Sequence, residues 1–229
     1  MKEVSELFEE FVNNIDNTIN VTGNQYMDNN THFLTCDTKW ARKGKIMKIQ
    51  IDEQVAYNVY IKDLVKNERI VIEGTYYPIS ISLSNPFDIS GTKISTNNEW
   101  NKASNNLLSK TPIIWLYSNY QDTIYGLESS LERTFTMNIA FLDETSPKYQ
   151  KNKDHIDNVV IPMKELVDSF IKSIDKNANY KKLKQYNIKT YSRFGVESEN
   201  GVIQNILDAD LGGVVLNITL DKFKEPCKC

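Results

Sequence analysis

Histidine, cysteine and glycine are scarce in this sequence, which has 2 His, 3 Cys and 9 Gly among its 229 residues. So few cysteines exclude the disulfide framework of a small secreted domain. The glycines form neither of the phosphate-binding patterns GxxxxGK(S/T) and GxGxxG, and no GxSxG nucleophile motif occurs. We therefore expect no catalytic residues, no cofactor and no bound metal.

Long apolar runs are also absent, since no stretch approaches the roughly 18 residues that a membrane-spanning helix needs. The N-terminus, MKEVSELFEEFV, is acidic and amphipathic, and it lacks the basic and apolar regions of a signal peptide. We expect a protein that is made in the cytoplasm and has no membrane partner.

A basic block is missing as well. Lys plus Arg number 27 against 30 Asp plus Glu, which gives a formal net charge of -3. Lys43, Lys45, Lys48 and Lys62 provide at most a thin basic groove. Tight binding to a nucleic-acid backbone is not indicated, because such binding depends on several phosphate contacts from Lys and Arg.

Two segments carry the apolar stripe of an amphipathic helix. In residues 3–19 the stripe consists of Val4, Leu7, Phe8, Phe11, Val12, Ile15 and Ile19. In residues 159–175 it consists of Val159, Met163, Leu166, Val167, Phe170, Ile171 and Ile174. Pro162 fits only near the first turn of the second helix.

Alternation with a period of two predicts strands elsewhere. Residues 45–83 alternate through several short strands, which indicates a small curved sheet or barrel. The segment SNPFDISGTKIST continues it as an irregular arm, and EWNKASNNLLS indicates a short helix. Larger strands are predicted at 111–118, 134–142, 186–194 and 213–223.

These elements predict an α+β fold in which two helices pack on a four-stranded, mainly antiparallel sheet. The core would comprise residues 1–20 and 111–229, and residues 21–110 would form a β-rich insertion, a small barrel or curved sheet plus an arm. Hydrophobic residues make up 40% of the chain, which is enough for a globular protein.

The residues that most often carry chemistry lie in polar or terminal sequence. His32 and His155 both fall in stretches that predict solvated loops. Cys227 and Cys229 could supply two thiolates to zinc, but a structural site needs four ligands, and Cys36 is distant in sequence. Three reduced thiols are the simpler interpretation.

Asp208, Asp210 and Asp221 resemble a carboxylate cluster along the chain, but their spacing matches no EF-hand loop. A polar turn before a strand explains the first two. Aromatic residues in turn-rich segments are more informative, because Tyr and Trp combine a large apolar area with a polar tip and often anchor interfaces. The candidate interface residues are Tyr76, Tyr77, Phe87, Trp100, Tyr120 and Tyr125.

The phrases VAYNVYIKDLVKNERIVIEG, FDISGTKISTNNEW, KTPIIWLYS, RTFTMNIAFLDE and DADLGGVVLNITLDKFKEPCKC follow one another along most of the chain. In this order the sequence resembles head-to-tail connector ring proteins of tailed bacteriophages, the crAss-like group in particular. The likeness rests on element order and loose phrases and includes no catalytic signature.

This resemblance implies a tail-terminator-like core and a homo-oligomeric ring of twelve subunits, with six as the alternative. The ring would contact the portal and other connector or tail proteins, and genomic DNA would be a passing cargo in its channel. The protein would belong to the virion, in the tail or head-tail connector, after assembly in the host cytoplasm. The insertion is nearly as large as the core, which departs from the smallest terminators.

Two other interpretations stay open. The protein could be a non-catalytic phage or host binding module whose β-rich insertion grips a peptide or a nucleic-acid strand. It could also be an enzyme with an unfamiliar site. The size of the purified chain would distinguish these, since a ring subunit forms a sharp high-order species and a binding module stays monomeric.

Overall fold

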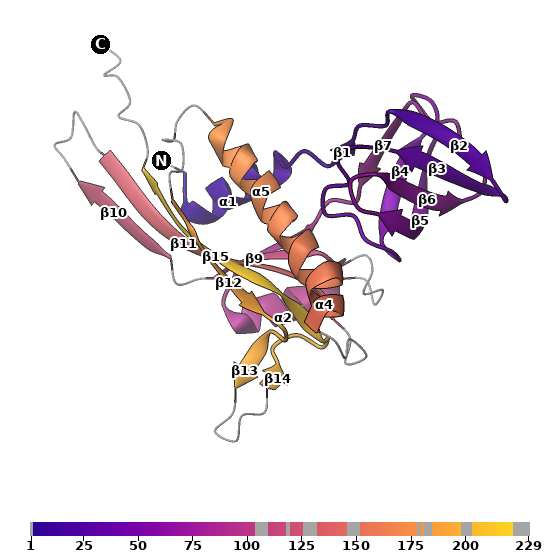
Figure 1. The fold of residues 1–229 in the computed structure, drawn as a ribbon. Coiled ribbons are helices and arrows are strands. Elements are labelled where there is room, and N and C mark those ends of the chain that lie inside the picture. The colour runs from indigo at the N-terminus through magenta and orange to yellow at the C-terminus, as the bar shows by residue number, and fades with distance from the viewer. Residues whose placement is uncertain are drawn as a thin grey trace, which may run out of the picture. The chain divides into compact units, whose positions relative to one another are not determined.

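Two compact units make up the chain in this computed structural model (Figure 1). The structure describes residues 2–103, 110–117, 120–125, 132–145, 152–177, 180, 185–197 and 203–221. Unit 1 comprises Met1–Ile15 and Pro86–Cys229, and unit 2 comprises Asp16–Asn85. Unit 2 ends earlier than the predicted insertion of residues 21–110, because the residues after Asn85 join the sheet of unit 1.

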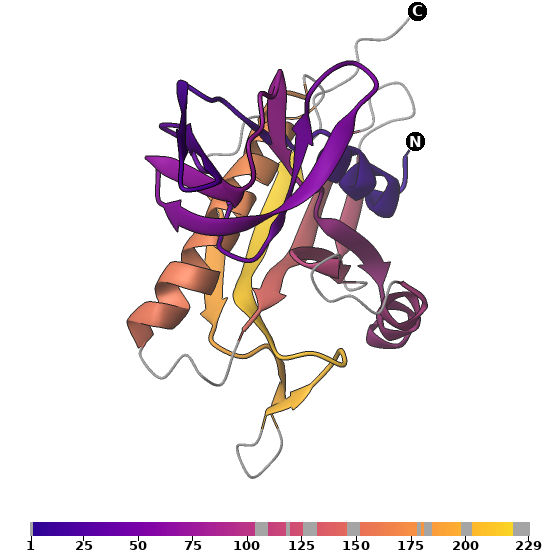
Figure 2. The same cartoon turned by 90° about the vertical axis from the view of Figure 1, so that its right-hand side faces the viewer.

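Unit 2 is a curled antiparallel sheet with the strand order β1-β7-β4-β5-β6-β3-β2 (Figure 2). Its strands are β1 (Thr18–Ile19), β2 (Gly23–Met27), β3 (Asn30–Leu34), β4 (Ile46–Gln50), β5 (Ala56–Val65), β6 (Arg69–Glu73) and β7 (Ser80–Leu83). The two edge strands, β1 and β2, are separated in the chain by residues 20–22 alone. Both edges of the sheet therefore meet at these residues.

Alternation within the strands builds the core of unit 2, as the sequence predicts for residues 45–83. The fully buried side chains on the inner face include Phe33, Met47, Ile49, Ile61, Ile70, Ile72 and Ile81. A register shift between Ile61 and Asp63 bends β5, which lets a sheet of this size curl.

Unit 1 contains a six-stranded sheet with the order β12-β15-β11-β9-β8, in which β10 also pairs with β11. Its strands are β8 (Phe87–Gly91), β9 (Ile113–Tyr117), β10 (Gln121–Tyr125), β11 (Glu132–Glu144), β12 (Asn187–Tyr191) and β15 (Leu211–Asp221). A separate hairpin consists of β13 (Gly195–Glu197) and β14 (Ile203–Asn205). All pairs in the larger sheet are antiparallel except β8 with β9.

The helices of unit 1 differ from the predicted ones in their bounds. They are α1 (Val4–Asn13), α2 (Lys93–Lys102), α4 (Asn152–His155), a π-helical segment (Ile156–Val160) and α5 (Ile161–Asp175). The second predicted helix thus extends upstream of residue 159. The π-helical segment precedes Pro162, whose missing N–H and bulky ring disturb regular α-helical bonding.

The first predicted helix ends at Asn13 instead of residue 19. The carboxylate of Asp16 accepts a hydrogen bond from the N–H of Thr18 at 3.1 Å, a local turn that competes with helix. Ile19 matches the helical stripe but belongs to β1 of unit 2, where it is buried. The apolar pattern thus continues to Ile19, past the actual end of the helix, so the pattern alone does not locate that end.

Helices α1 and α5 cover one face of the larger sheet (Figure 1). The ring of Phe170 lies 6.2 Å from the rings of Phe8 and Phe11 and 5.5 Å from that of Phe141 on β11. The hydroxyl of Ser173 donates a hydrogen bond to the carbonyl of Phe11 at 2.8 Å. Burial of each such aromatic side chain contributes about 1.5–3 kcal/mol, so this contact holds the helices to the sheet.

The opposite face of the same sheet is covered too. Its core consists of Ile89, Trp100, Ile113, Trp115, Ala140, Leu142, Phe194, Leu207 and Leu211. Successive residues of β11 therefore point into two separate cores, with Phe141 on one face and Ala140 and Leu142 on the other.

The predicted fold class was wrong. The protein is mostly β, with a seven-stranded curled antiparallel sheet and a second, six-stranded sheet, and not two helices on a four-stranded sheet. Two features caused the error. The arm at SNPFDISGTKIST contains β8, which pairs parallel to β9, and the stretch after Tyr117 contains β10. Both strands lack a clear alternation because one is short and the other is exposed.

Candidate interface on unit 2

Four tyrosine side chains form two ring pairs on unit 2 and are here named the tyrosine cluster: Tyr26, Tyr57, Tyr76 and Tyr77. The ring centroids of Tyr26 and Tyr77 lie 4.9 Å apart, and those of Tyr57 and Tyr76 lie 6.1 Å apart. The hydroxyl of Tyr26 donates a hydrogen bond to the main-chain carbonyl of Tyr76 at 3.0 Å. Tyr77 is 69% exposed. The cluster therefore presents aromatic surface that is already ordered.

Thr31, which is fully buried on β3, fixes the turn that carries two of these rings. Its hydroxyl donates to the carbonyl of Gly74 at 2.7 Å and accepts from the N–H of Tyr76 at 3.1 Å. Gly74 has φ +95°, and a Cβ at this position would lie 2.9 Å from the ring of Tyr76. The close approach of this ring thus requires glycine.

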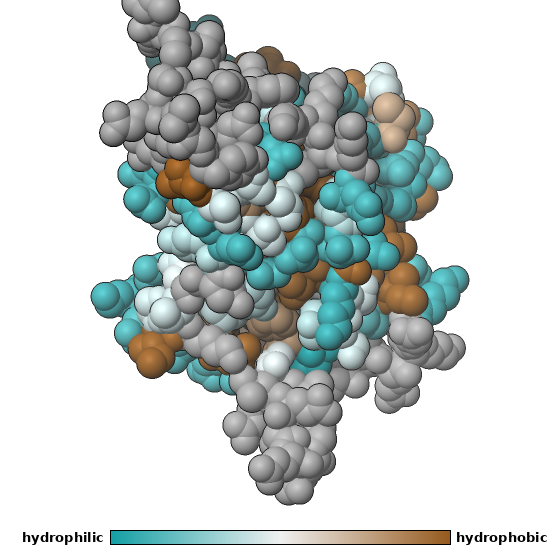
Figure 3. Space-filling model, turned by 90° about the vertical axis from the view of Figure 1, so that its left-hand side faces the viewer, coloured by the Kyte–Doolittle hydropathy of each residue, from teal (hydrophilic) through white to brown (hydrophobic). Residues whose placement is uncertain are grey.

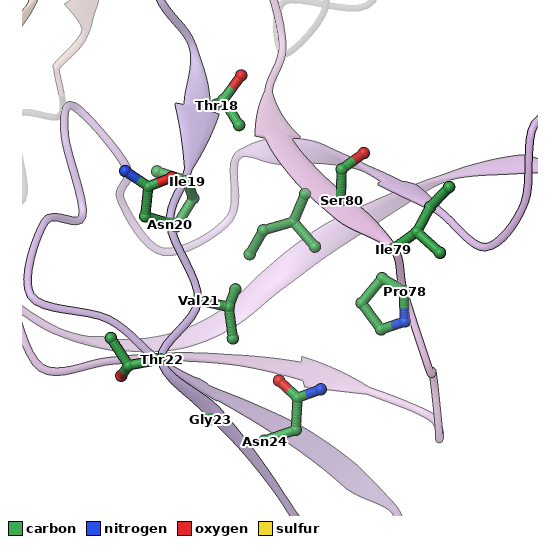
Figure 4. A pocket seen from close by; sticks show the side chains of 11 residues that line it. Thr18, Ile19, Asn20, Val21, Thr22, Gly23, Asn24, Pro78, Ile79 and Ser80 are labelled. Atoms are coloured by element: carbon green, nitrogen blue, oxygen red, sulfur yellow. The ribbon is translucent and has the colours of Figure 1, made fainter.

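A groove lies beside the cluster, between residues 18–24 on one side and residues 78–81 on the other (Figure 4). Its volume is about 450 Å³, which is within the range of ligand-binding pockets. Tyr77 precedes Pro78 in the chain, and Tyr26 follows Asn24 by two residues on β2. The groove and the tyrosine cluster are therefore neighbours along both chain segments.

The groove exists because β1 and β7 separate after two paired residues. Ile19 pairs with Ile81, and continued pairing would place Val21 opposite Ile79. Instead the N–H of Ile79 bonds the carbonyl of Gln50 on β4 at 2.8 Å. Val21 and Ile79 remain 36% and 66% exposed, although Ile19 and Ile81, two residues away, are buried.

The chemistry of the groove is neutral. Its polar side chains are those of Thr18, Asn20, Thr22, Asn24 and Ser80, and none of its lining residues is charged. Such a surface forms hydrogen bonds and apolar contacts. Phosphate groups and metal ions would find no charge of opposite sign among the lining residues.

The other candidate interface residues lie in unit 1. Trp100 is 3% exposed and belongs to the core, and Phe87 packs against the same core with its ring 6.3 Å from that of Trp100. Neither presents a free aromatic face to a partner. Tyr120 is exposed, and the side chain of Tyr125 lies outside the described residues.

Sequence reasoning missed Tyr26, Tyr57 and Val21 as surface residues. Alternation assigned Tyr57 to the inner face of β5 with Ile61, and Ile61 is indeed buried. Tyr57 lies four residues before Ile61, near the N-terminal end of β5. There the inner face of the strand is no longer covered, and Tyr57 is exposed. The alternation gives the face of a residue but does not say where along the strand the core ends.

His155 is buried, so the prediction of a solvated loop was wrong for this residue. It ends α4, and its Nδ1 lies 3.3 Å from the hydroxyl of Thr145. Burial lowers the pKa of the imidazole below its ordinary value, and the main chain of Tyr191 partly opposes this shift. His32 lies on β3 and is half-buried, which also differs from a loop.

The three aspartates do not meet. Asp208 and Asp210 precede β15, and Asp221 lies at the far end of this eleven-residue strand. Asp210 forms an ion pair with Arg193 at 2.9 Å, and Asp221 accepts a hydrogen bond from Thr134 at 2.8 Å. Within the described ranges, no group of three or more His, Cys, Asp and Glu side chains is placed to hold a metal ion.

The structure describes one of the three cysteines and all four of the candidate lysines. Cys36 is an exposed free thiol, whereas Cys227 and Cys229 lie outside the described residues. Lys45 is buried, and the ammonium group of Lys62 donates to the side-chain carbonyl of Asn30 at 2.9 Å. The thin basic groove of the sequence analysis is therefore not a continuous exposed surface.

Comparison with known proteins returns no match to a family model, a curated protein or a solved structure. Among the described residues, no helix combines the length and the apolar character needed to cross a membrane.

Proposed function

We propose that this protein is a structural, non-catalytic subunit of a homo-oligomeric ring in the head-tail connector or tail of a tailed bacteriophage. The phage assignment depends on the sequence resemblance. The assignment as an assembling subunit is supported by the surface of unit 2, and this surface does not depend on the predicted tail-terminator-like core.

The observation that supports assembly is the distribution of exposed apolar side chains. Unit 2 carries eight of the fourteen large exposed hydrophobic side chains in the described part of the chain. They are Val21, Tyr26, Met27, Val55, Tyr57, Tyr60, Tyr77 and Ile79. Exposed apolar side chains gathered on one part of a protein are typical of a binding surface.

In unit 1, the edges of the larger sheet are the surfaces that could take part in assembly. Strands β8 and β12 end the strand order of its larger sheet. Unpaired strand edges are templates for pairing with another chain, which a ring of identical subunits can use repeatedly. On the face seen in Figure 3, by contrast, hydrophobic surface is interrupted by hydrophilic side chains. The sheet edges of unit 1 and the tyrosine cluster of unit 2 are the contact surfaces in this proposal.

In this function the partners are further copies of the chain, the portal and other connector or tail proteins, with twelve subunits to a ring and six as the alternative. Genomic DNA passes through the channel without being held. Because the net charge is -3, we expect duplex DNA to bind no more tightly than about 10⁻⁴ M at physiological salt. A micromolar isotherm that weakens steeply with salt would favour a nucleic-acid-binding module instead.

Native mass spectrometry and electron microscopy of the purified full-length chain test this function. The expected result is a closed ring with one defined number of subunits and a central channel. A chain that remains monomeric at every concentration, alone and with the portal protein of the same phage, would contradict the proposal.

A further inference from the structure

We infer that the groove between residues 18–24 and 78–81 receives an extended, uncharged segment of a partner protein, which adds to the sheet of unit 2 as a strand. This inference goes beyond ring formation, because it assigns a ligand class to one site within a single subunit. Three independent features of the groove support it.

The first feature is an unfinished piece of core. Val21 and Ile79 follow the buried residues Ile19 and Ile81 on the inner face, and the register would bring them together. The two strands separate before this contact forms, so both apolar side chains stay exposed. An inserted segment with an apolar side chain would cover them and complete the core at this point.

The second feature is unpaired main chain. Leu83 donates its N–H to the carbonyl of Asn17, and hydrogen-bonded pairs recur at every second residue of an antiparallel ladder. The next such positions are Ile19 and then Val21, whose N–H and C=O would face β7 if the pairing of Ile19 with Ile81 continued. In the described part of the chain, the main chain of Val21 has no hydrogen bond. These groups can pair with an added strand.

The third feature is the neutral lining, which selects the side chains of the occupant. A charged side chain entering the groove would lose hydration without gaining an ion pair. Side chains of an extended segment alternate between two sides. The apolar side chains would lie near Val21, and small polar ones near Asn24.

A peptide is favoured over the other neutral ligand class, a carbohydrate. The hydroxyl and amide groups of the lining could bind a sugar. A sugar, however, would neither pair with the main chain of Val21 nor account for the apolar side chains of Val21 and Ile79 that are left exposed where the strands separate. The repetitive N–H and C=O groups of an extended peptide match both features.

The test uses the full-length chain and a defined probe, an acetylated and amidated pentapeptide of alternating threonine and valine. Fluorescence anisotropy of the labelled peptide measures binding, and hydrogen–deuterium exchange mass spectrometry locates it. We expect saturable binding and slower exchange in the fragments covering residues 18–24 and 78–81. The same peptide with N-methylated amides should lose at least tenfold in affinity, because it cannot pair with the main chain.

Two matched variants assign the site. Val21→Lys places a charge in the groove and should abolish binding, whereas Val55→Lys, at a valine of similar exposure outside the groove, should bind like the parent. Both folds are checked by circular dichroism. Peptide binding and hydrogen exchange do not depend on the number of subunits in the assembly. If the peptide does not bind, the ring proposal is therefore unaffected, and if the chain is monomeric, binding to the groove can still be tested.

Four results would overturn the inference. They are slow exchange around Val21 without peptide, equal binding of the N-methylated peptide, unchanged binding by Val21→Lys, and no binding of the parent peptide. Protection of the groove by maltopentaose, with no effect of the peptide, would replace the inference with a sugar site.

Discussion

Arg133 and Asp122 form a two-pronged ion pair across the β10–β11 hairpin. The Nε atom of Arg133 lies 2.9 Å from Oδ1 of Asp122, and its Nη2 atom lies 2.5 Å from Oδ2. The third guanidinium nitrogen donates to the carbonyl of Lys2 at 2.6 Å. The side chain of Arg133 is 4% exposed and that of Asp122 is 25% exposed, so the ion pair that joins the N-terminal segment to the hairpin is only partly open to solvent.

Removal of the acidic partner should destabilise unit 1. Asp122→Asn leaves the buried guanidinium with a weaker acceptor, and we expect the free energy of unfolding to fall by about 2 kcal/mol. Glu10→Gln removes the exposed ion pair with Lys2 and should lower the free energy of unfolding by less. Urea titrations of both variants measure the difference. Equal losses of unfolding free energy in the two variants would show that burial of Arg133 does not strengthen its ion pair with Asp122.

His155 should make stability depend on pH. Burial lowers its native pKa below the unfolded value of roughly 6.5, so the unfolded chain takes up a proton first as the pH falls. The free energy of unfolding should therefore decrease between pH 6.5 and the lower native pKa, and it should be unaffected by this group above that window.

The variant His155→Gln tests this dependence. Urea unfolding at a series of pH values should show a shallower slope below pH 6.5 for His155→Gln than for the parent. A parental slope in His155→Gln would assign the dependence to other groups.

Gly213 should tolerate no side chain. Its φ is +149°, and a Cβ would lie 2.1 Å from the carbonyl oxygen of Phe141 on the neighbouring strand. We expect Gly213→Ala to lower the free energy of unfolding by about 3 kcal/mol. Gly44→Ala is the matched control, since Gly44 also has positive φ but no atom within 4 Å, and it should cost about 1 kcal/mol. Thermal unfolding of both variants compares the two costs.

The tyrosine cluster should affect assembly more than folding. Tyr26→Ala combined with Tyr77→Ala removes a ring pair that is largely exposed, so the melting temperature should change little while subunit association weakens. Tyr60→Ala is the control, because Tyr60 is equally exposed but lies on the opposite face of β5 from Tyr57. Sedimentation velocity measures association. If Tyr60→Ala weakens association as much as the double variant, the cluster is not the contact.

The long, strongly periodic elements could be predicted from the sequence. The stripe of Phe170 and its neighbours predicts α5, because the buried face of a helix recurs at every third or fourth residue. The alternation of Phe135, Met137, Ile139 and Phe141 predicts β11, because residues on one face of a strand recur at every second position. The same logic found the strands that form the core of unit 2.

What pairs with these elements could not be predicted. β8 is five residues long, and its parallel pairing with β9 is decided by tertiary contacts of Ile89 that no local pattern records. The groove was unpredictable for the same reason, since Val21 and Ile79 look like ordinary strand residues in the sequence. Their exposure follows from a separation of strands that only the fold reveals.

The entry and exit of unit 2 lie side by side, which determines how it responds to mechanical load. The side-chain amide of Asn17 donates to the side-chain oxygen of Asn85 at 2.6 Å and to the carbonyl of Leu83 at 2.9 Å. Tension along the chain that pulls Asp16 and Asn85 apart would break the antiparallel β1–β7 pair one rung at a time, because adjacent ends of such a pair unzip instead of shearing. Since β1 leads directly into residues 20–24, force on the chain would dismantle the groove before the inner strands bear any load.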